Sequence, residues 1–157
     1  MIDVNVINPF IKGAIDVVGM TTGMSLMMGK PYARDMDFKD EDTLRVILGV
    51  TGQMQGRVLI SIPIDNAKKI ASNMMMGMPV EELDDMSMSA LSELGNMIMG
   101  TSATYLSGNG VLVDITPPMI EKGMLYIDRE HYQSICVPLN LENRPYLEMN
   151  ILVNTAA

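Results

Sequence analysis

Glu93 and Asn96 are the residues of this sequence whose types and spacing best suit a reaction. They are three residues apart, so in a helix their carboxylate and carboxamide lie on one face. Ser89 and Gly100 extend the spacing, in steps of four, three and four residues. A carboxylate can pair with a cation, and a carboxamide donates and accepts hydrogen bonds without carrying charge. Gly100 costs a helix interior about 1 kcal/mol against Ala, but it would let a partner approach closely. A solvated helix face, with Gly100 packed against a strand, would give the same pattern.

Other chemistries find little support in the sequence. His131 is the only histidine, and nothing around a serine resembles a nucleophile elbow. A zinc site needs several His or Cys ligands, and the chain has one cysteine, Cys136. Among the methionines beside Asn96, only Met97 and Met99 are near enough to contribute to binding, and methionine at helical spacing more often fills a core. We expect no metal or cofactor of the protein's own.

A long helix over residues 85–106 must position Glu93 and Asn96. Asp84 and Asp85 suit its start, where negative charge complements the helix dipole, and Gly108 and Gly110 suit its end. One apolar stripe along this helix is expected to face the core, and it comprises Leu91, Leu94, Ile98, Thr101 and Tyr105. The Glu93 and Asn96 stripe lies away from it.

Two further helices are predicted upstream. Asn8 and Pro9 read as the cap and first position of a helix that fades at Gly19 and Gly23. Asp65 reads as the cap of a short helix that Gly77 stops.

Strands make up most of the remaining chain. Residues 44–50 and 57–62 predict a hairpin, whereas 30–38 is a weak and charged strand candidate. Strands are also predicted at residues 111–115, 124–128, 132–137 and 146–153. The last of these alternates, with Leu147, Met149, Ile151 and Val153 on one face.

Composition narrows the class of protein. The 157 residues are 48% apolar and 19% charged, which is typical of one globular domain spanning residues 1–157. A net charge of −8 argues against nucleic acid and against an anionic membrane surface as partners. A single cysteine suits a reducing compartment, and the first residues lack the basic and apolar regions of a signal peptide. We expect a cytoplasmic protein.

The spacing Ser89, Glu93, Asn96, Gly100 resembles the active-site helix of the CheC/CheX/FliY phosphatases of bacterial chemotaxis. Residues 5–11 and 49–62 are similar to the CheX branch in particular. The resemblance implies an α+β fold, a CheC-like two-layer sandwich of long helices on a mostly antiparallel sheet, with a degenerate internal duplication. Aligning Gly19 with Gly100 places Lys12 at the Glu93 position and Ile15 at the Asn96 position. One site per chain is therefore expected.

The resemblance also implies a reaction and a partner. The substrate would be the aspartyl phosphate of a CheY-type response regulator, which supplies its own Mg²⁺ and Lys. Asn96 would orient the attacking water, as a Gln does in small GTPases, and Glu93 would pair with the regulator's Lys. Ser89, Met97 and Gly100 would contact the docked regulator. CheX-like proteins are also expected to form homodimers.

Two other interpretations stay open. In the first, the chain would be a non-catalytic CheC-fold adaptor, such as a flagellar-switch binding module. In the second, it would be an unrelated regulatory domain whose Glu93 and Asn96 stripe lies in a dimer interface. Burial of Asn96 would favour the second. The charge of −8 also requires local complementarity for docking on an acidic regulator. Lys12, Arg57, Lys68 and Lys69 are the basic residues considered for that role.

Overall fold

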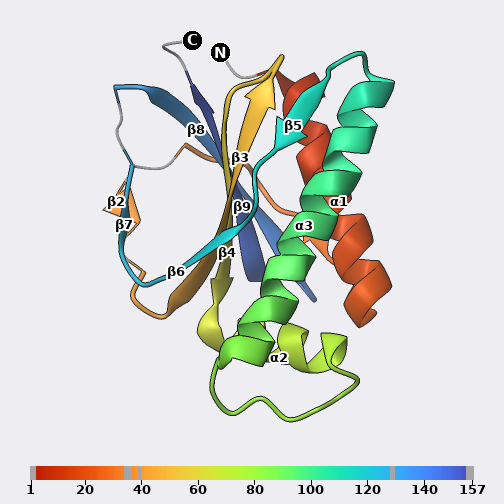
Figure 1. Cartoon of the computed structure of the whole chain (residues 1–157), viewed down its shortest axis with the longest axis vertical. Coiled ribbons are helices and arrows are strands. Elements are labelled where there is room, and N and C mark those ends of the chain that lie inside the picture. Colours follow the sequence, from red (N-terminus) through yellow and green to blue (C-terminus); the bar gives the residue numbers. More distant parts are fainter. Residues whose placement is uncertain (1–2, 34–36, 39, 128–129, 155–157) are drawn as a thin grey trace.

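Two long helices cover one face of an antiparallel sheet, and this arrangement confirms the predicted α+β class (Figure 1). The computed structural model describes residues 3–33, 37–38, 40–127 and 130–154. Helices α1 (Val4–Thr22) and α3 (Asp85–Gly108) run side by side, and the shorter α2 (Ile64–Met74) lies at one end of the molecule. None of the described helices is both long and apolar enough to cross a membrane.

The main sheet has seven strands in the order β1-β8-β9-β4-β3-β5, with β6 also paired to β3. Every pairing is antiparallel. The predicted hairpin at its centre is confirmed and extends further than expected, as β3 (Thr43–Gly52) and β4 (Gly56–Pro63). The other strands are β1 (Met27–Met28), β5 (Val113–Ile115), β6 (Met119–Lys122), β8 (Tyr132–Leu141) and β9 (Arg144–Asn154).

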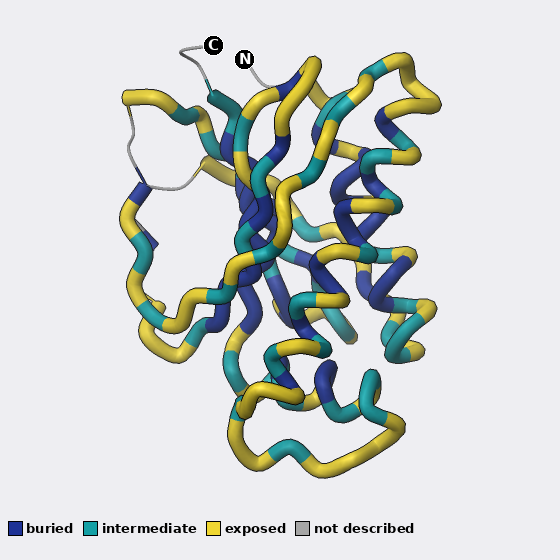
Figure 2. Tube along the Cα trace, viewed as in Figure 1, coloured by how far each residue is buried: buried dark blue, intermediate teal, exposed yellow. Residues whose placement is uncertain are grey.

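The sheet carries a hydrophobic core on each face. The larger core lies under the helices, where Phe10, Ala14 and Val18 of α1 and the inner side of α3 meet β3, β4 and β9. The smaller core lies on the other face, under a second sheet of β2 (Asp37–Phe38) and β7 (Leu125–Tyr126), and consists of Phe38, Leu59, Ile127 and Leu152. The centre of the sheet is therefore buried on both sides, as the dark tube in Figure 2 shows.

The alternation predicted for β9 is confirmed for the helix-facing side. Leu147, Met149 and Ile151 are buried in the larger core, and Val153 is half-buried against it. Leu152 on the opposite side is fully buried as well, because the second sheet covers that face.

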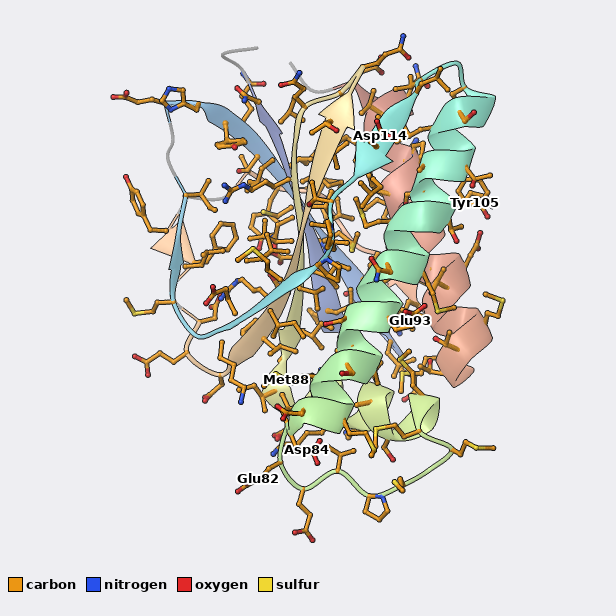
Figure 3. The ribbon with its side chains drawn as sticks, in the orientation of Figure 1. Glu82, Asp84, Met88, Glu93, Tyr105 and Asp114 are labelled. Carbon is orange, nitrogen blue, oxygen red and sulfur yellow. The ribbon has the colours of Figure 1, made fainter. Side chains whose placement is uncertain are left out.

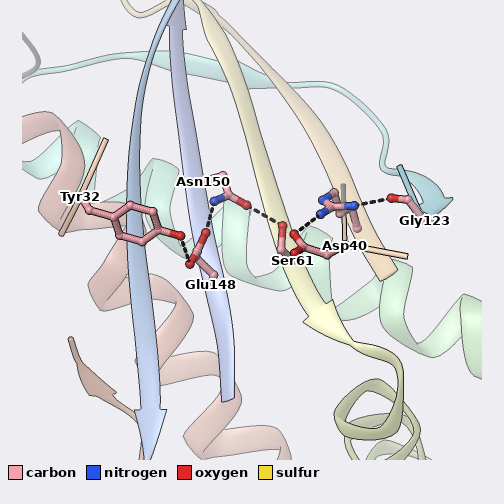
Figure 4. Close-up of polar contacts among 7 residues, drawn as sticks. Tyr32, Asp40, Ser61, Gly123, Glu148 and Asn150 are labelled. Carbon is pink, nitrogen blue, oxygen red and sulfur yellow. Dashed lines mark hydrogen bonds and ion pairs between the residues drawn. The ribbon is translucent and has the colours of Figure 1, made fainter. Parts of the chain in front are cut away.

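A chain of polar side chains crosses the face of the sheet away from the helices (Figure 4). Tyr32 donates its hydroxyl proton to Glu148 at 2.5 Å, and the Asn150 amide donates to the same carboxylate at 2.7 Å. Ser61 donates to the Asn150 carbonyl oxygen at 2.5 Å. Ser61 and Asn150 are both buried, so these hydrogen bonds satisfy groups that would otherwise be costly to bury.

A fully buried arginine lies further along the same face. Arg45 donates to the carbonyl of Gly123 and to the Asp40 carboxylate, the latter at 2.9 Å. Its guanidinium carbon lies 5.2 Å from the centre of the Phe38 ring. These contacts tie β3 to the second sheet.

The predicted start of the first helix was wrong. Asp3, not Asn8, is the N-cap, since its carboxylate accepts from the backbone N–H of Asn5 at 2.9 Å. Pro9 therefore lies inside α1, which begins early enough to bury Ile7 together with Phe10. The predicted end is confirmed, because Gly23 caps the helix in a left-handed conformation with φ 77°.

The cap assigned to the short helix was also wrong. Asp65 lies in the first turn of α2, and Pro63 is the N-cap. Pro63 has no side-chain group that could cap the helix. The backbone N–H of Ile64 donates instead to the backbone carbonyl of Asp42 at 2.9 Å. The helix ends at Met74, three residues before the predicted stop at Gly77.

The strand predicted at 30–38 is not continuous over the described residues. Tyr32 forms an isolated bridge with Cys136, and residues 37–38 form β2, while 34–36 lie outside the description. The strand predicted at 124–128 is reduced to β7, and Asp128 is likewise outside. Strands β1 and β6 were not predicted, because very short edge strands carry almost no alternation. The internal duplication stays a prediction.

Candidate functional site

Helix α3 begins at a well-formed cap. The carboxylate of Asp84 accepts from the backbone N–H of Ser87 at 2.9 Å and from its hydroxyl at 2.8 Å. These hydrogen bonds hold the pKa of the Asp84 carboxyl below its usual value of 3.8. The helix runs to Gly108, two residues beyond the prediction, and Asn109 caps it through backbone hydrogen bonds.

The inner face of α3 fixes its distance from both neighbours. Leu91, Leu94 and Ile98 are buried as predicted, whereas Thr101 and Tyr105 are only half-buried. The buried line passes instead to Ser102 and Leu106, because a 3.6-residue repeat drifts across a stripe of strict three and four residue steps.

Two glycines allow close packing around this face. A Cβ built on Gly95 would lie 2.7 Å from Val46 Cγ1 on β3. A Cβ on Gly13 of α1 would collide with the Ser102 hydroxyl of α3. A side chain at either glycine would force a neighbouring group to shift, so both glycines allow α3 to pack closely on α1 and β3.

The outer face of α3 brings together the residues predicted as the site. Ser89, Glu93, Asn96 and Gly100 are all exposed. Figure 3 places Glu93 midway along α3. Among the described residues, neither the Glu93 nor the Asn96 side chain makes a hydrogen bond or an ion pair with the rest of the chain. Both polar groups are therefore available to a partner, and the exposure of Asn96 lends no support to a buried structural role.

Gly100 has no packing reason to be a glycine. A Cβ built on it would meet nothing within 4 Å. The alternative considered from the sequence, close packing of Gly100 against a strand, is therefore wrong, and Gly95 is the residue that packs in that way. Gly100 leaves open space on the exposed stripe, one turn beyond Asn96.

The two methionines beside Asn96 differ in accessibility. Met97 is half-buried and packs against the larger core, so only part of its side chain reaches the surface. Met99 is fully buried and serves the core.

A polar cluster that the sequence analysis did not anticipate joins α3 to α1. The Tyr105 hydroxyl donates to Asp16 at 2.5 Å, and the Lys12 ammonium lies 3.0 Å from the same carboxylate. Lys12 also lies 4.1 Å from the centre of the Tyr105 ring. The hydrogen bond from Tyr105, followed by that from Lys12, holds the pKa of Asp16 below 3.8, and hydrogen bonding to Asp16 raises the pKa of Lys12. The spacing of Lys12 and Asp16 was the available sequence signal.

The stripe itself offers one ionisable group, the Glu93 carboxylate. Within the described ranges, no three His, Cys, Asp or Glu side chains come together in a way that could hold a metal ion. From Ile70 to Glu121 the sequence contains no Lys or Arg, so every charge on α3 is negative. The site thus presents one carboxylate and one carboxamide on a helix that carries no basic side chain of its own.

Comparisons with known proteins place this geometry in context. A model of the family described as Chemotaxis phosphatase CheX matches residues 44–140. The CheY-P phosphatase CheX of Thermotoga maritima is 33% identical over 121 residues, which is 77% of each chain. A CheC-like superfamily protein from a Shewanella species has the same fold, with a TM-score of 0.84, 24% identity, and coverage of 98% of this chain and 99% of the other. A chain of the CheX-CheY-BeF3-Mg+2 complex from Borrelia burgdorferi matches with a TM-score of 0.75, 27% identity, and coverage of 98% and 99%.

Proposed function

This chain belongs to the CheX family of chemotaxis phosphatases, and on that basis we propose that it hydrolyses the aspartyl phosphate of a CheY-type response regulator by inserting the outer face of α3. The observation that carries the proposal is the exposure of Glu93 and Asn96 on one stripe of a helix whose inner face is packed closely on β3 and α1. Positioning is the chemistry required, and positioning demands a rigid support.

Asn96 orients the attacking water in this proposal. Its carboxamide oxygen can accept a hydrogen bond from the water, and its NH₂ group can donate one to the water or to a phosphoryl oxygen, without adding negative charge beside the phosphoryl group. The regulator contributes Mg²⁺ and a Lys to stabilise the charge on that group, in keeping with the CheX-CheY complex that contains Mg²⁺. The missing element is a water held in line, and the exposed amide of Asn96 supplies it.

Glu93 fixes the register of docking by pairing with the regulator's active-site Lys. Its carboxylate has no hydrogen-bond or ion-pair partner among the described residues of its own chain, and α3 itself carries no Lys or Arg. Glu93 is one turn before Asn96, so a pairing at Glu93 defines how deeply Asn96 enters the regulator's site.

Ser89 and Gly100 bound the inserted segment. Both are exposed, one turn to either side of the Glu93 and Asn96 pair, and Gly100 lets the regulator's backbone or side chains approach α3 closely. The accessible part of Met97 adds an apolar contact beside Asn96.

The test is the decay of a phosphorylated CheY-type regulator with Mg²⁺, alone, with wild type and with Asn96→Ala. Orientation of the attacking water should raise the dephosphorylation rate roughly a hundredfold, which corresponds to about 3 kcal/mol of activation free energy. The acceleration by wild type is therefore expected to disappear in Asn96→Ala. Asn73→Ala, which removes an exposed amide from α2, is the matched control and should behave as wild type. Equal acceleration by wild type and Asn96→Ala would place the site elsewhere. No acceleration by either would favour the adaptor interpretation, which a binding titration then tests.

We also propose that residues 1–157 act as one domain in the cytoplasm, as a homodimer joined edge to edge through the strands of the second half. Strands β5 and β6 lie at one edge of the sheet, and Met119 of β6 is 61% exposed. An exposed edge strand is a template for pairing with another chain, and Lys on such an edge opposes it. Light scattering should therefore give a dimer mass for wild type and a lower mass for Met119→Lys. A monomer mass for wild type would refute this arrangement.

A further inference from the structure

We propose that a methionine-lined groove at the N-terminal end of α3 is a second contact surface for the same response regulator, and that it takes apolar side chains bordered by basic ones. The proposal rests on the proposed function, because the regulator is placed by the position of its phosphorylation site over Asn96. It adds a source of binding energy that Glu93 and Asn96 cannot supply, since both are polar and their task is orientation.

The groove lies between the end of α2 and the start of α3. Its apolar lining comes from Met75, Met78, Pro79, Val80 and Met86, which we call the methionine groove. The exposed fractions are 53% for Met78 and 61% for Met86, so these side chains are not core filling. Exposed apolar side chains that gather around a groove mark interaction surfaces, and methionine adapts to partners of irregular shape.

The methionine groove is continuous with the proposed site. Met86 precedes Glu93 by seven residues, which is two helical turns, and so it begins the same exposed stripe. Its distance from Asn96 along the axis is about 15 Å at 1.5 Å per residue. A standard interface buries about 800 Å² per partner, equivalent to a disc of radius about 16 Å. A regulator centred on Asn96 therefore reaches Met86.

The opposite end of the stripe is mostly polar. The exposed residues in the last turns of α3 are Thr104, Ser107 and Gly108, followed by Asn109 and Gly110, and a single exposed apolar side chain, Leu112, lies beyond them. The methionine groove therefore adds to the apolar contact that the accessible part of Met97 provides beside Asn96.

The charges around the groove define the chemistry of its partner. Glu81, Glu82 and Asp84 line it and are exposed, and Asp85 and Glu93 follow on α3. Figure 3 shows Glu82 and Asp84 below the first turn of α3. The nearest basic side chains in the sequence are Lys68 and Lys69 of α2, which line a neighbouring pocket on the far side of Val80 and do not line the groove itself. Two copies of this surface would repel each other, whereas a face with Lys or Arg around apolar side chains would be attracted. The charges therefore disfavour a second copy, and the regulator is the occupant because its position over Asn96 brings it to Met86; its local face there must be less acidic than the regulator as a whole.

The experiment compares Met78→Gln/Met86→Gln with wild type in two assays on a phosphorylated or beryllofluoride-activated CheY-type regulator with Mg²⁺. Glutamine keeps the length and helix propensity of methionine while removing its apolar character. In the decay assay we expect KM to rise about tenfold with kcat unchanged, because the groove contributes binding and not orientation. In the binding assay Kd should rise by the same factor. The matched control is Met124→Gln, at a methionine that is 67% exposed far along the chain between β6 and β7, and it should match wild type.

The failure of this inference is distinguishable from failure of the proposed function. If wild type accelerates decay, Asn96→Ala abolishes the effect and the double variant retains the wild-type KM, the proposed function stands and the groove has no role. If wild type binds the regulator without accelerating decay, the Kd of the double variant still decides the question. A fall in the mass of the double variant by light scattering would show that the groove joins copies of this chain, and would overturn the assignment. Binding that is unaffected by added NaCl would contradict the basic border assigned to the regulator.

Discussion

Gly95 and Gly100 lie five residues apart on α3 and have opposite surroundings. The missing side chain of Gly95 leaves room for Val46 of β3, while that of Gly100 leaves only solvent. The first glycine therefore sets the position of the helix on the sheet, and the second leaves space for a partner. The two contributions are separable by substitution.

Gly100→Ala is expected to stabilise the fold and impair the reaction. Alanine is favoured over glycine in a helix by up to about 1 kcal/mol, and its Cβ meets nothing within 4 Å here. In the proposed complex the same methyl group occupies space that the regulator needs, so regulator dephosphorylation should slow. Urea unfolding and the phosphate-decay assay measure the two effects. Gly19→Ala on α1, where the added Cβ makes only an ordinary contact, controls for stability alone. Unchanged activity in Gly100→Ala would remove Gly100 from the docking surface.

Gly95→Ala is expected to destabilise the fold by about 1–3 kcal/mol, since overpacking a close contact costs more than the helix gains. The contact predicts coupling with Val46, because the added Cβ would lie 2.7 Å from Val46 Cγ1. The double variant Gly95→Ala/Val46→Ala should therefore lose less stability than the sum of the single variants, as measured by urea unfolding. Strict additivity would show that the strain is relieved elsewhere.

Asp16→Asn is expected to lower stability in a pH-dependent way. Tyr105 and Lys12 hold the folded-state pKa of Asp16 below 3.8, so the carboxylate contributes stability above pH 3.8 that is lost as the pH falls through the folded pKa. The difference in urea midpoint between wild type and variant should thus be present at pH 6 (about two pH units above the unfolded value) and shrink below pH 3.8. Tyr105→Phe keeps the ring beneath Lys12 and should show part of the effect. A difference that is constant with pH would mean that the hydrogen bond does not depend on the charge.

Ser61→Ala is expected to destabilise the fold by about 1–3 kcal/mol without changing kcat. The substitution leaves the buried Asn150 carbonyl oxygen without the hydroxyl that donates to it. Ser61 is on the face of the sheet away from α3, so the site should keep its geometry. Urea unfolding and the decay assay at saturating regulator check both statements. A fall in kcat at full folding would reveal coupling through the sheet.

Glu93→Gln is expected to weaken docking more than it slows the bound reaction. The substitution keeps the shape of the side chain and removes the charge that pairs with the regulator's Lys, so KM should rise further than kcat falls. Because charge-assisted pairs weaken as salt screens them, the wild-type and variant KM values should converge as NaCl is added. A variant that loses kcat and keeps KM would instead assign Glu93 to the chemical step.

Local patterns in the sequence predicted those features that depend on residues close together along the chain. The periodicity of Leu91, Leu94 and Ile98 predicted the inner face of α3, and therefore the exposure of Glu93 and Asn96. The hairpin of β3 and β4 follows from two apolar runs joined by a glycine-bounded turn.

Long-range contacts account for most of what was missed. Tyr105 and Asp16 are 89 residues apart, and no local pattern pairs them. Leu59 and Leu152 are buried on the far face only because β2 and β7 return to cover it. The misplaced start of α1 had a local cause, since Asn8 and Pro9 imitate a cap that Asp3 provides five residues earlier.

Burial of the sheet centre on both faces has a consequence for local opening. Strands β4 and β9 are hydrogen-bonded on both sides and carry side chains in both cores, so their amide protons should exchange with solvent only through global unfolding. The segment between α2 and α3 has largely exposed residues and should exchange through small local fluctuations. Met86, at the start of α3, adjoins this readily exchanging segment, whereas Asn96 follows Gly95, which packs against Val46 of β3 next to the slowly exchanging β4.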